Sequence, residues 1–237
     1  MQTSVTGGVL EATAHKEVWR RTATTLVADL TLLSRYRLTF ERFQEIVGHN
    51  GPVAESSFVR YVRTWYGEAL MSIVRRQSDA DERYNSLRTL LDDMLQRTEA
   101  YSRKSLNVLF TEFGDRPPVE GYFSDFISKE TYAVFADSSG DTLDTDKISR
   151  DIETLGDISW ELRHIIERAL EDRERHGLDG DGGMTLTALG SAVDSFEDLA
   201  KPYVALLAGA PYVYYRPANE LQWTEIFTFP WINRNDA

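Results

Sequence analysis

The sequence predicts an all-α fold, a helical bundle with long antiparallel helices and a packed C-terminal tail. Apolar residues recur at helical spacing along several long segments, and polar or glycine- and proline-containing stretches separate these segments. Residues that cap helices stand at several of the expected helix starts. The chain has 237 residues, of which 42% are hydrophobic and 27% charged, so it can bury a sizeable core.

The longest apolar stripe predicts a first helix from about Lys16 to Val47. Its main positions repeat every seven residues, and companion positions fill the same face over roughly eight turns. The segment His49–Pro52 contains glycine and proline and ends this helix. The predicted buried face consists of Trp19, Leu26, Leu30, Leu33, Tyr36, Phe40, Phe43 and Val47.

A second helix is predicted from about Glu55 to Arg76. A third helix begins after Asn85 or Ser86, because either side chain can accept a hydrogen bond from the first turn. The apolar faces of both helices are expected in the core, with Trp65 as a packing residue. These faces consist of Phe58, Val62, Trp65, Ala69 and Ile73, and of Leu87, Leu90, Leu91, Met94 and Leu95.

Residues 101–143 have a weaker pattern. A short helix is expected at Ser105–Phe113 and a turn at Gly114–Pro118. The aromatic-rich segment Tyr122–Phe135 suits either an inserted helix or an extended excursion. The sequence therefore predicts a single domain over residues 1–237, with an insertion or a variable connection at about 115–140.

Two more helices complete the predicted bundle. Asp144 or Thr145 caps the first of them, which runs to His176, and Thr187 caps the second. Pro202 lies inside the second helix and is expected to kink it. The apolar tail at 221–233 is expected to pack back onto the helices. The buried faces consist of Ile148, Ile152, Leu155, Leu162, Ile166 and Ala169, and of Leu189, Val193, Phe196, Leu199, Tyr203 and Leu206.

Composition narrows the classes of partner. The net charge of −12 argues against generic nucleic-acid binding, and DNA is not expected as a partner. The chain has no cysteine, which fits a reducing cytosol and excludes disulfides and thiolate zinc sites. The N-terminus lacks the pattern of a signal peptide, and the apolar stretch Tyr203–Tyr215 is too short to cross a bilayer. We expect a soluble cytoplasmic protein without a membrane partner.

The segment Glu161–Asp179 is rich in arginine and reaches His176 just before a glycine-rich loop. Arginine and histidine together at a helix end can cleave RNA or bind an anion. They also suit an ordinary helix end, because the helix dipole favours positive side chains in the last turn. Gly177 is in place for a left-handed cap. The residues alone leave both interpretations open.

The sequence lacks the motifs of several other functional classes. The chain contains no GxxxxGKS or GxxxxGKT, no GxGxxG and no GxSxG motif. The loop Asp179–Gly183 lacks the third acidic ligand and the closing glutamate of an EF-hand. His164 and His176 are too far apart in sequence for a two-histidine metal site on one helix. We therefore expect neither a metal nor another cofactor.

Four segments together resemble the AbiU-type abortive-infection branch of the HEPN superfamily. They are RYRLTFERFQEIVG at 35–48, WYGEALMSIVRRQSDADERYNSLRTLLDDML at 65–95, ISRDIETLGDISWELRHIIERALEDRERHGLD at 148–179 and TLTALGSAVDSFEDLAKPYVALLAG at 185–209. Their order and spacing carry the resemblance, which covers most of the chain outside about 115–140.

The resemblance implies an all-α HEPN-like bundle, often a symmetric homodimer, from bacterial defence or toxin–antitoxin systems. Active members are metal-independent ribonucleases whose signature is an Arg with four to six residues before a His. Here His176 matches the histidine, but the required spacing falls on Ala169, Leu170 or Glu171. Arg168 lies just outside, with seven residues between it and His176.

Two hypotheses about function follow. In the first, the chain is a metal-independent endoribonuclease with a degenerate motif, in which His176 is the acid/base and Arg168 holds phosphate. Arg173 and Arg175 then assist in binding phosphate, and RNA or a cognate antitoxin protein is the partner. In the second, the chain is a non-catalytic, acidic helical interaction module that binds itself or a partner.

Overall fold

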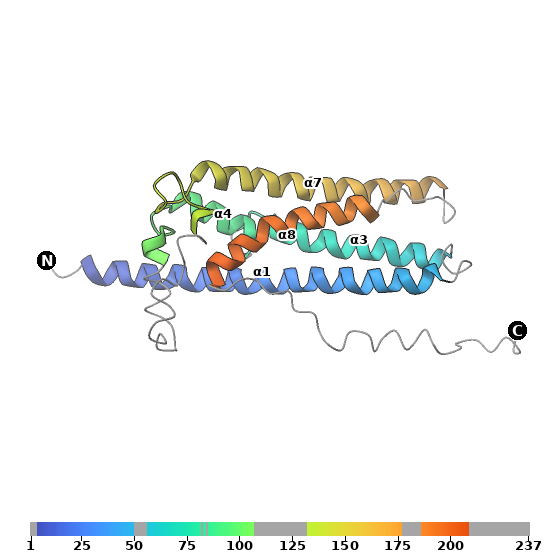
Figure 1. The fold of residues 1–237 in the computed structure, drawn as a ribbon, viewed down its shortest axis with the longest axis horizontal. Helices are drawn as coiled ribbons and strands as arrows, with labels where there is room; N and C mark the ends of the chain where they lie inside the picture. Colours follow the sequence, from blue (N-terminus) through green and yellow to red (C-terminus); the bar gives the residue numbers. More distant parts are fainter. Residues whose placement is uncertain are drawn as a thin grey trace, which may run out of the picture.

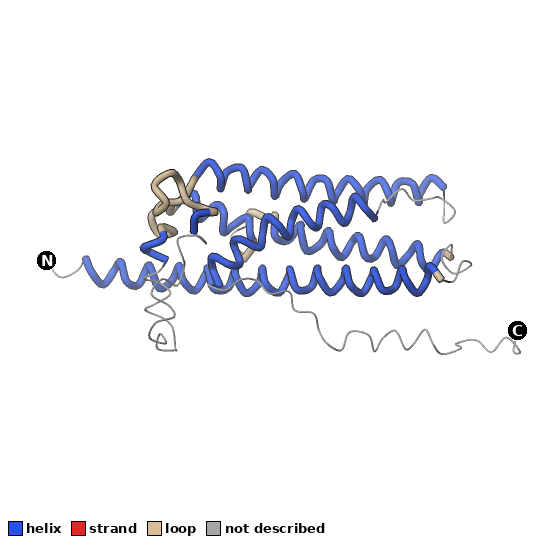
Figure 2. Tube along the Cα trace, in the orientation of Figure 1, coloured by secondary structure: helices blue, strands red, loops and turns tan. Residues whose placement is uncertain are grey.

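The computed structural model describes residues 4–49, 56–81, 83, 85–106, 132–176 and 186–208. Helices dominate these residues, and the all-α prediction is confirmed (Figure 2). No β-strand occurs among them, although Ala136 and Leu143 form an isolated antiparallel bridge. The labelled helices are α1 (Ser4–Gly48), α3 (Ser57–Gln77), α4 (Leu87–Gln96), α7 (Thr145–His176) and α8 (Leu186–Ala208).

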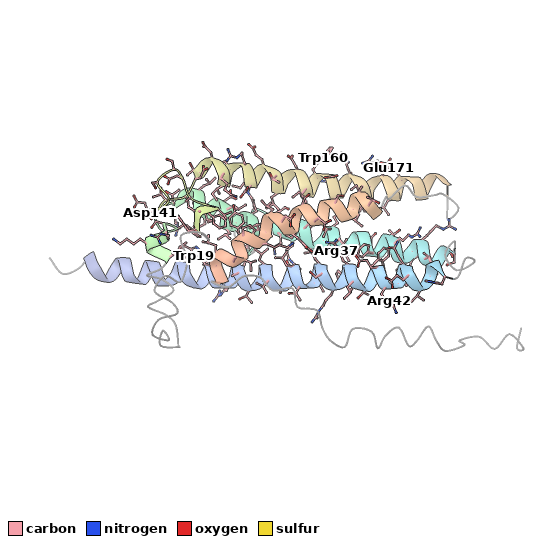
Figure 3. All side chains as sticks on the ribbon, in the orientation of Figure 1. Trp19, Arg37, Arg42, Asp141, Trp160 and Glu171 are labelled. Carbon is pink, nitrogen blue, oxygen red and sulfur yellow. The ribbon has the colours of Figure 1, made fainter. Side chains whose placement is uncertain are left out.

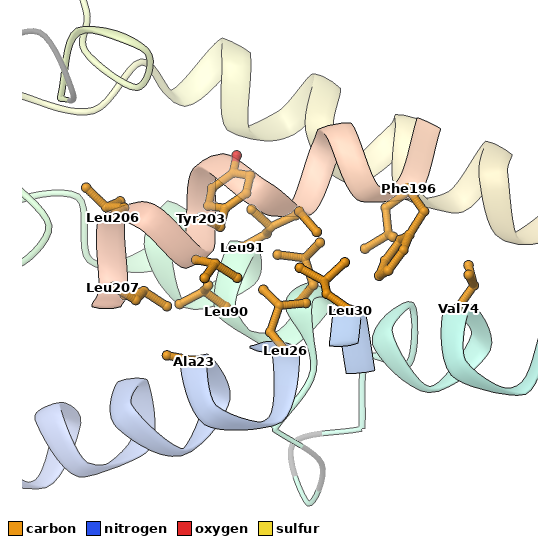
Figure 4. Close-up of a cluster of buried hydrophobic side chains, with 14 of the residues drawn as sticks. Ala23, Leu26, Leu30, Val74, Leu90, Leu91, Phe196, Tyr203, Leu206 and Leu207 are labelled. Carbon is orange, nitrogen blue, oxygen red and sulfur yellow. The ribbon is translucent and has the colours of Figure 1, made fainter. Parts of the chain in front are cut away.

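The helices form a bundle in which α3 and α4 follow one another along the same side (Figure 1). Helix α1 packs against α3, α4 and α8, and α7 packs against the same three helices. Apolar side chains from all five helices belong to one core cluster. Figure 4 shows part of it, with side chains from α1, α3, α4 and α8. The bundle therefore has two long outer helices, α1 and α7, with the other helices between them.

Helix α1 confirms the predicted stripe at almost every position. Its buried members include Trp19, Leu26, Leu33, Phe40 and Val47. Tyr36 is the exception, because its side chain is exposed at the surface between α1 and α3. The helix also begins earlier than the prediction, at Ser4 instead of about Lys16.

The helix starts follow the predicted capping chemistry in two of three cases. Ser86 and Thr89 form a reciprocal capping box at α4. Asp144 caps α7, because its Oδ1 accepts from the backbone N–H groups of Asp146 and Lys147, both at 3.0 Å. The prediction for Thr187 is wrong, because α8 already begins at Leu186.

Helix α8 carries Pro202 in its interior, as predicted. Proline has no N–H to donate to the preceding turn, and Figure 1 shows α8 turning toward α1 over its C-terminal part. The side chains of Phe196, Tyr203 and Leu206 are buried on both sides of this proline. The bend therefore lets a single helix keep contact with the core along its length.

Part of the predicted insertion belongs to the core. Tyr132 and Phe135 are buried, and the Tyr132 hydroxyl donates to the carbonyl of Tyr101 at 2.8 Å. Helical backbone at 103–106 agrees with the beginning of the predicted helix at 105–113. The rest of that helix, the turn at 114–118 and the segment 122–131 lie outside the described residues, as does the tail at 221–233.

Helix α3 buries a face that differs from the predicted one. Phe58 and Trp65, expected in the core, are 58% and 61% exposed. The buried side instead contains Val59, Leu70 and Val74, one residue further along each turn. One residue is about 100° around a helix, so the buried face is displaced from the predicted one. The prediction is confirmed for Ile73, which is buried, and Val62 packs against the core.

A buried polar cluster explains this difference. Asp29 of α1 is 4% exposed, and its Oδ2 accepts hydrogen bonds from Gln77 Nε2 at 2.6 Å and Arg76 Nε at 3.0 Å. Gln77 Oε1 in turn accepts the backbone N–H of Leu87 at 2.8 Å. The two side chains thereby connect α1, the C-terminal end of α3 and the first residue of α4. Because a buried carboxylate requires such donors, Gln77 has to face inward.

Within the described residues, no helix is both long and apolar enough to span a membrane.

The Asp29→Ala variant is expected to lose about 2–3 kcal/mol of unfolding free energy. The substitution leaves the buried Gln77 amide without its acceptor, whereas the half-exposed Arg76 can turn to water. Urea denaturation measures the loss. Asp81→Ala, which breaks an exposed pair with Arg83, should keep the wild-type midpoint. Equal midpoints for Asp29→Ala and wild type would contradict the role of the cluster.

Candidate functional site

Of the four residues proposed for catalysis or phosphate binding, the structure describes one side chain. Arg168 is exposed on α7, and its Nε donates to the carbonyl of His164 at 3.2 Å. His176 is the last residue of α7. The side chains of Arg173, Arg175 and His176 lie outside the described residues.

One continuous helix carries both Arg168 and His176. Eight residues correspond to about 12 Å along the axis and about 80° around it. Helical side chains lean toward the N-terminus, and the hydrogen bond of Arg168 to His164 follows this direction, away from His176. Within one chain, the described geometry therefore does not bring Arg168 toward His176.

The charges beside Arg168 are largely paired. Arg163 Nε lies 2.7 Å from Glu167 Oε1, and His164 Nδ1 lies 3.4 Å from Glu167 Oε2. The hydrogen bond from Arg163, with a smaller contribution from His164, lowers the pKa of Glu167. Glu167 therefore stays charged and offsets the positive side chains, which weakens the attraction of this surface for phosphate.

Trp160 stands on the same outer surface of α7 and is 62% exposed (Figure 3). Its ring meets the ring of His164 edge to face at a centroid distance of 4.0 Å. This is a single exposed aromatic side chain among charged neighbours.

An apolar concavity lies between α1 and α3. It is an open groove of about 650 Å³. The residues that line it are Tyr36, Thr39, Phe40, Phe43, Phe58, Val62, Trp65, Tyr66, Glu68 and Ala69. Six of these ten residues are aromatic, and Glu68 is the single charged one. We call this feature the α1–α3 groove.

Aromatic contacts give the α1–α3 groove a firm floor and an exposed rim. The rings of Phe40 and Tyr66 stack at a centroid distance of 4.0 Å and an interplanar angle of 6°. Phe43, which is buried, meets the exposed Phe58 edge to face at 6.3 Å. Trp65 stands on the rim, where its polar indole N–H and large apolar ring suit it to contact another molecule.

Charged side chains of α1 and α8 form a cluster next to the floor of the groove. Arg37 Nη1 lies 2.6 Å from Asp194 Oδ1 and 3.7 Å from Glu197 Oε1 (Figure 3). Lys201 Nζ approaches the other oxygen of Glu197 at 3.3 Å. Burial, together with the nearby carboxylates, raises the pKa of Tyr66 to about 12, although Arg37 opposes the rise. Tyr66 therefore stays neutral, and the groove floor carries no charge at physiological pH.

A second, smaller concavity of about 340 Å³ lies around Asp93, between α1 and α4. Its central carboxylate already has structural partners. Trp19 Nε1 donates to Asp93 Oδ2 at 3.1 Å, and the Tyr101 hydroxyl donates to the same oxygen at 2.7 Å. Arg97 Nε lies 3.2 Å from Oδ1. These contacts hold the N-terminal half of α1 against α4.

Metal ligands do not gather in the part of the chain that the structure describes. No group of three or more His, Asp or Glu side chains there could hold a metal ion. The glycine-rich loop Asp179–Gly183, considered above for calcium, lies outside the described residues.

Comparison of the chain with models of known families, with curated proteins and with solved structures gave no significant match. Function therefore has to be inferred from the chain's own residues.

Sequence reasoning missed the α1–α3 groove because it assigned Phe58 and Trp65 of α3 to the core. A signal was present in the sequence. Helix α3 has one set of apolar residues at 58, 62 and 65 and a second set at 59, 66 and 70. Together the two sets cover more of the helix than one buried face requires. An apolar surplus of this kind on a soluble helix indicates a surface that binds something.

Tyr66 should contribute to the alkaline sensitivity of the fold. Below pH 10 the Tyr66 hydroxyl is neutral in both the folded and the unfolded chain, so its contribution to the free energy of unfolding is fully present. Between pH 10 and 12 the unfolded chain ionises first, and stability falls as pH rises. Tyr66→Phe should therefore lose less stability than wild type across this window in urea denaturation. Tyr61→Phe, on the exposed side of α3, is the control. Parallel losses in wild type and Tyr66→Phe would contradict the prediction.

Proposed function

We propose that this chain is a HEPN-like interaction module and that its α1–α3 groove binds an apolar, aromatic-rich peptide segment of a partner protein. The observation that carries the proposal is the pair of exposed aromatic side chains Phe58 and Trp65, which line the groove together with the stacked floor of Phe40 and Tyr66. Exposed apolar area of this kind is unfavourable in water, and a partner that covers it gains the hydrophobic free energy.

The dimensions of the groove fit a short peptide. Phe58 and Ala69 are eleven residues apart on α3, which corresponds to about 16 Å along the helix axis. This length matches three turns of an amphipathic helix or about five extended residues. The aromatic rim supplies the anchor type that dominates binding energy in many interfaces. Because the chain has a net charge of −12, a neutral or basic segment suits it best.

The HEPN part of the proposal rests on the fold and on the placement of the four resembling segments. These segments fall on α1, on α3 with α4, on α7 and on α8, all within an all-α bundle. In this proposal the protein acts in cytoplasmic bacterial defence of the AbiU or toxin–antitoxin type, as the resemblance implies. In that setting, a cognate antitoxin is a natural source of the bound segment.

A metal-independent ribonuclease is the second candidate. The observation in its favour is that the exposed Arg168 shares a continuous, solvent-facing helix with His176. In this proposal, His176 is the acid/base, while Arg168, Arg173 and Arg175 hold phosphate. Because Arg168 leans away from His176 in one chain, the site requires a homodimer that brings two α7 helices together.

Selection from a displayed random-peptide library tests the binding proposal. Peptides enriched on the full-length chain should be rich in aromatic residues, and their affinity should fall at least tenfold for Trp65→Ala, which removes an anchor. Trp160→Ala is a matched control, because Trp160 and Trp65 are 62% and 61% exposed. Selected peptides that bind Trp65→Ala as tightly as wild type would contradict the proposal.

RNA cleavage in EDTA tests the second candidate. If His176 is the acid/base, His176→Ala should cut single-stranded RNA about 10²- to 10⁴-fold more slowly than wild type. Arg168→Ala should also be slower, whereas Arg150→Ala, at the other end of α7, should keep wild-type activity. Absence of cleavage by the wild-type chain, or equal cleavage by wild type and His176→Ala, would exclude this site.

A further inference from the structure

The chain carries an aromatic-rich segment beyond its last described helix. Helix α8 ends at Ala208, and 29 residues follow. Among them, the segment Leu221–Trp231 contains four aromatic residues and one charged residue, Glu225. Its aromatic content matches that of the ligand proposed for the α1–α3 groove.

We propose that Leu221–Trp231 of the same chain occupies the α1–α3 groove and that a partner has to displace it. This inference rests on the proposed function, because it concerns the same groove and the same class of ligand. It adds a regulatory step, since the chain then supplies a competing ligand for its own binding site.

The connecting chain is long enough. Leu207, next to the end of α8, belongs to the same core cluster as Ala23 of α1 (Figure 4). Phe40, in the groove floor, is seventeen residues further along α1, or about 26 Å. Residues 209–220 can span up to about 40 Å when extended. The segment therefore reaches the groove without strain.

The sequence of the segment fits the shape of the groove. Phe227, Phe229 and Trp231 alternate with Thr228 and Pro230. In an extended chain, alternate side chains share one face, so these three aromatic rings cover about 13 Å. Proline also favours an extended conformation for the residue before it. Three aromatic side chains on one face thus match the length of the groove.

Charge favours the chain's own segment over a second copy of the protein. The chain has 38 acidic and 26 basic residues, so two copies repel one another. The stretch from Ile226 to Trp231 carries no charge and meets a groove in which Glu68 is the single charged residue. Covalent attachment also gives the segment an effective concentration of the order of millimolar.

Photo-crosslinking in the full-length chain tests the inference. The chain has no native cysteine, so Thr39→Cys places a single thiol on the exposed wall of the groove for a benzophenone label. After irradiation, mass spectrometry should find crosslinks to residues 221–231 at the mass of one chain. Glu68→Cys, on the α3 side, provides a second labelled position. Thr154→Cys, exposed on α7, is the control and should not label that segment.

Two results would overturn the inference. One is the absence of crosslinks from Thr39→Cys and Glu68→Cys to residues 221–231. The other is crosslinking to that segment at the mass of two chains, which indicates that a second copy fills the groove.

A triple substitution separates this inference from the proposed function. Phe227→Ser, Phe229→Ser and Trp231→Ser together should free the groove and raise the affinity of library-selected peptides at least tenfold. Unchanged affinity, with binding still dependent on Trp65, would overturn the inference and leave the partner-binding proposal standing. Crosslinks to residues 221–231, with no peptide selected on wild type or on the triple variant, would support the inference and contradict the partner-binding proposal.

Discussion

Asp29 places a carboxylate in the core of a helical bundle, and the arrangement of three helices depends on how this carboxylate is satisfied. An unpaired buried carboxylate costs several kcal/mol, so its donors must be brought inside with it. Gln77 supplies one donor, Arg76 supplies others from the edge of the core, and the second end of the Gln77 amide accepts the first N–H of α4. Because Gln77 has to point inward, the rotation of α3 about its axis is fixed. The start of α4 is fixed by the same side chain.

The rotation of α3 determines what the protein presents to solvent. With Gln77, Val74 and Leu70 inside, the residues about 100° to 180° away around the helix lie at the surface. Phe58 and Trp65 are among them, and they form a rim next to the floor made by Phe40 and Tyr66. The α1–α3 groove is therefore a consequence of the core and not a separate addition to it. A charged cluster of Arg37, Asp194, Glu197 and Lys201 joins α1 to α8 next to this floor.

The sequence predicted the fold well where one face of a helix is apolar and the other is polar. Helix α1 has one such stripe, and its face was assigned correctly apart from Tyr36. Helix α3 has apolar residues on two faces, and periodicity cannot choose between them. The choice depends on Asp29, which is 48 residues from Gln77 in sequence and whose partners no local pattern reveals. The α7 site was predicted from the resemblance to HEPN proteins, in which His176 matches the histidine of the motif and Arg168 lies outside its spacing. The structure locates Arg168 on the surface of α7, and within one chain its side chain leans away from His176.

Hydrogen exchange at the backbone amide of Leu87 tests the central claim most directly. The first N–H groups of a helix have no partner within it and ordinarily exchange quickly. In this protein the Leu87 N–H donates to Gln77 Oε1 inside the core. The amide should therefore exchange slowly in the wild-type chain and much faster in Asp29→Ala, where Gln77 loses its anchor. Rapid exchange of the Leu87 amide in the wild-type chain would contradict the claim that this buried cluster fixes the rotation of α3.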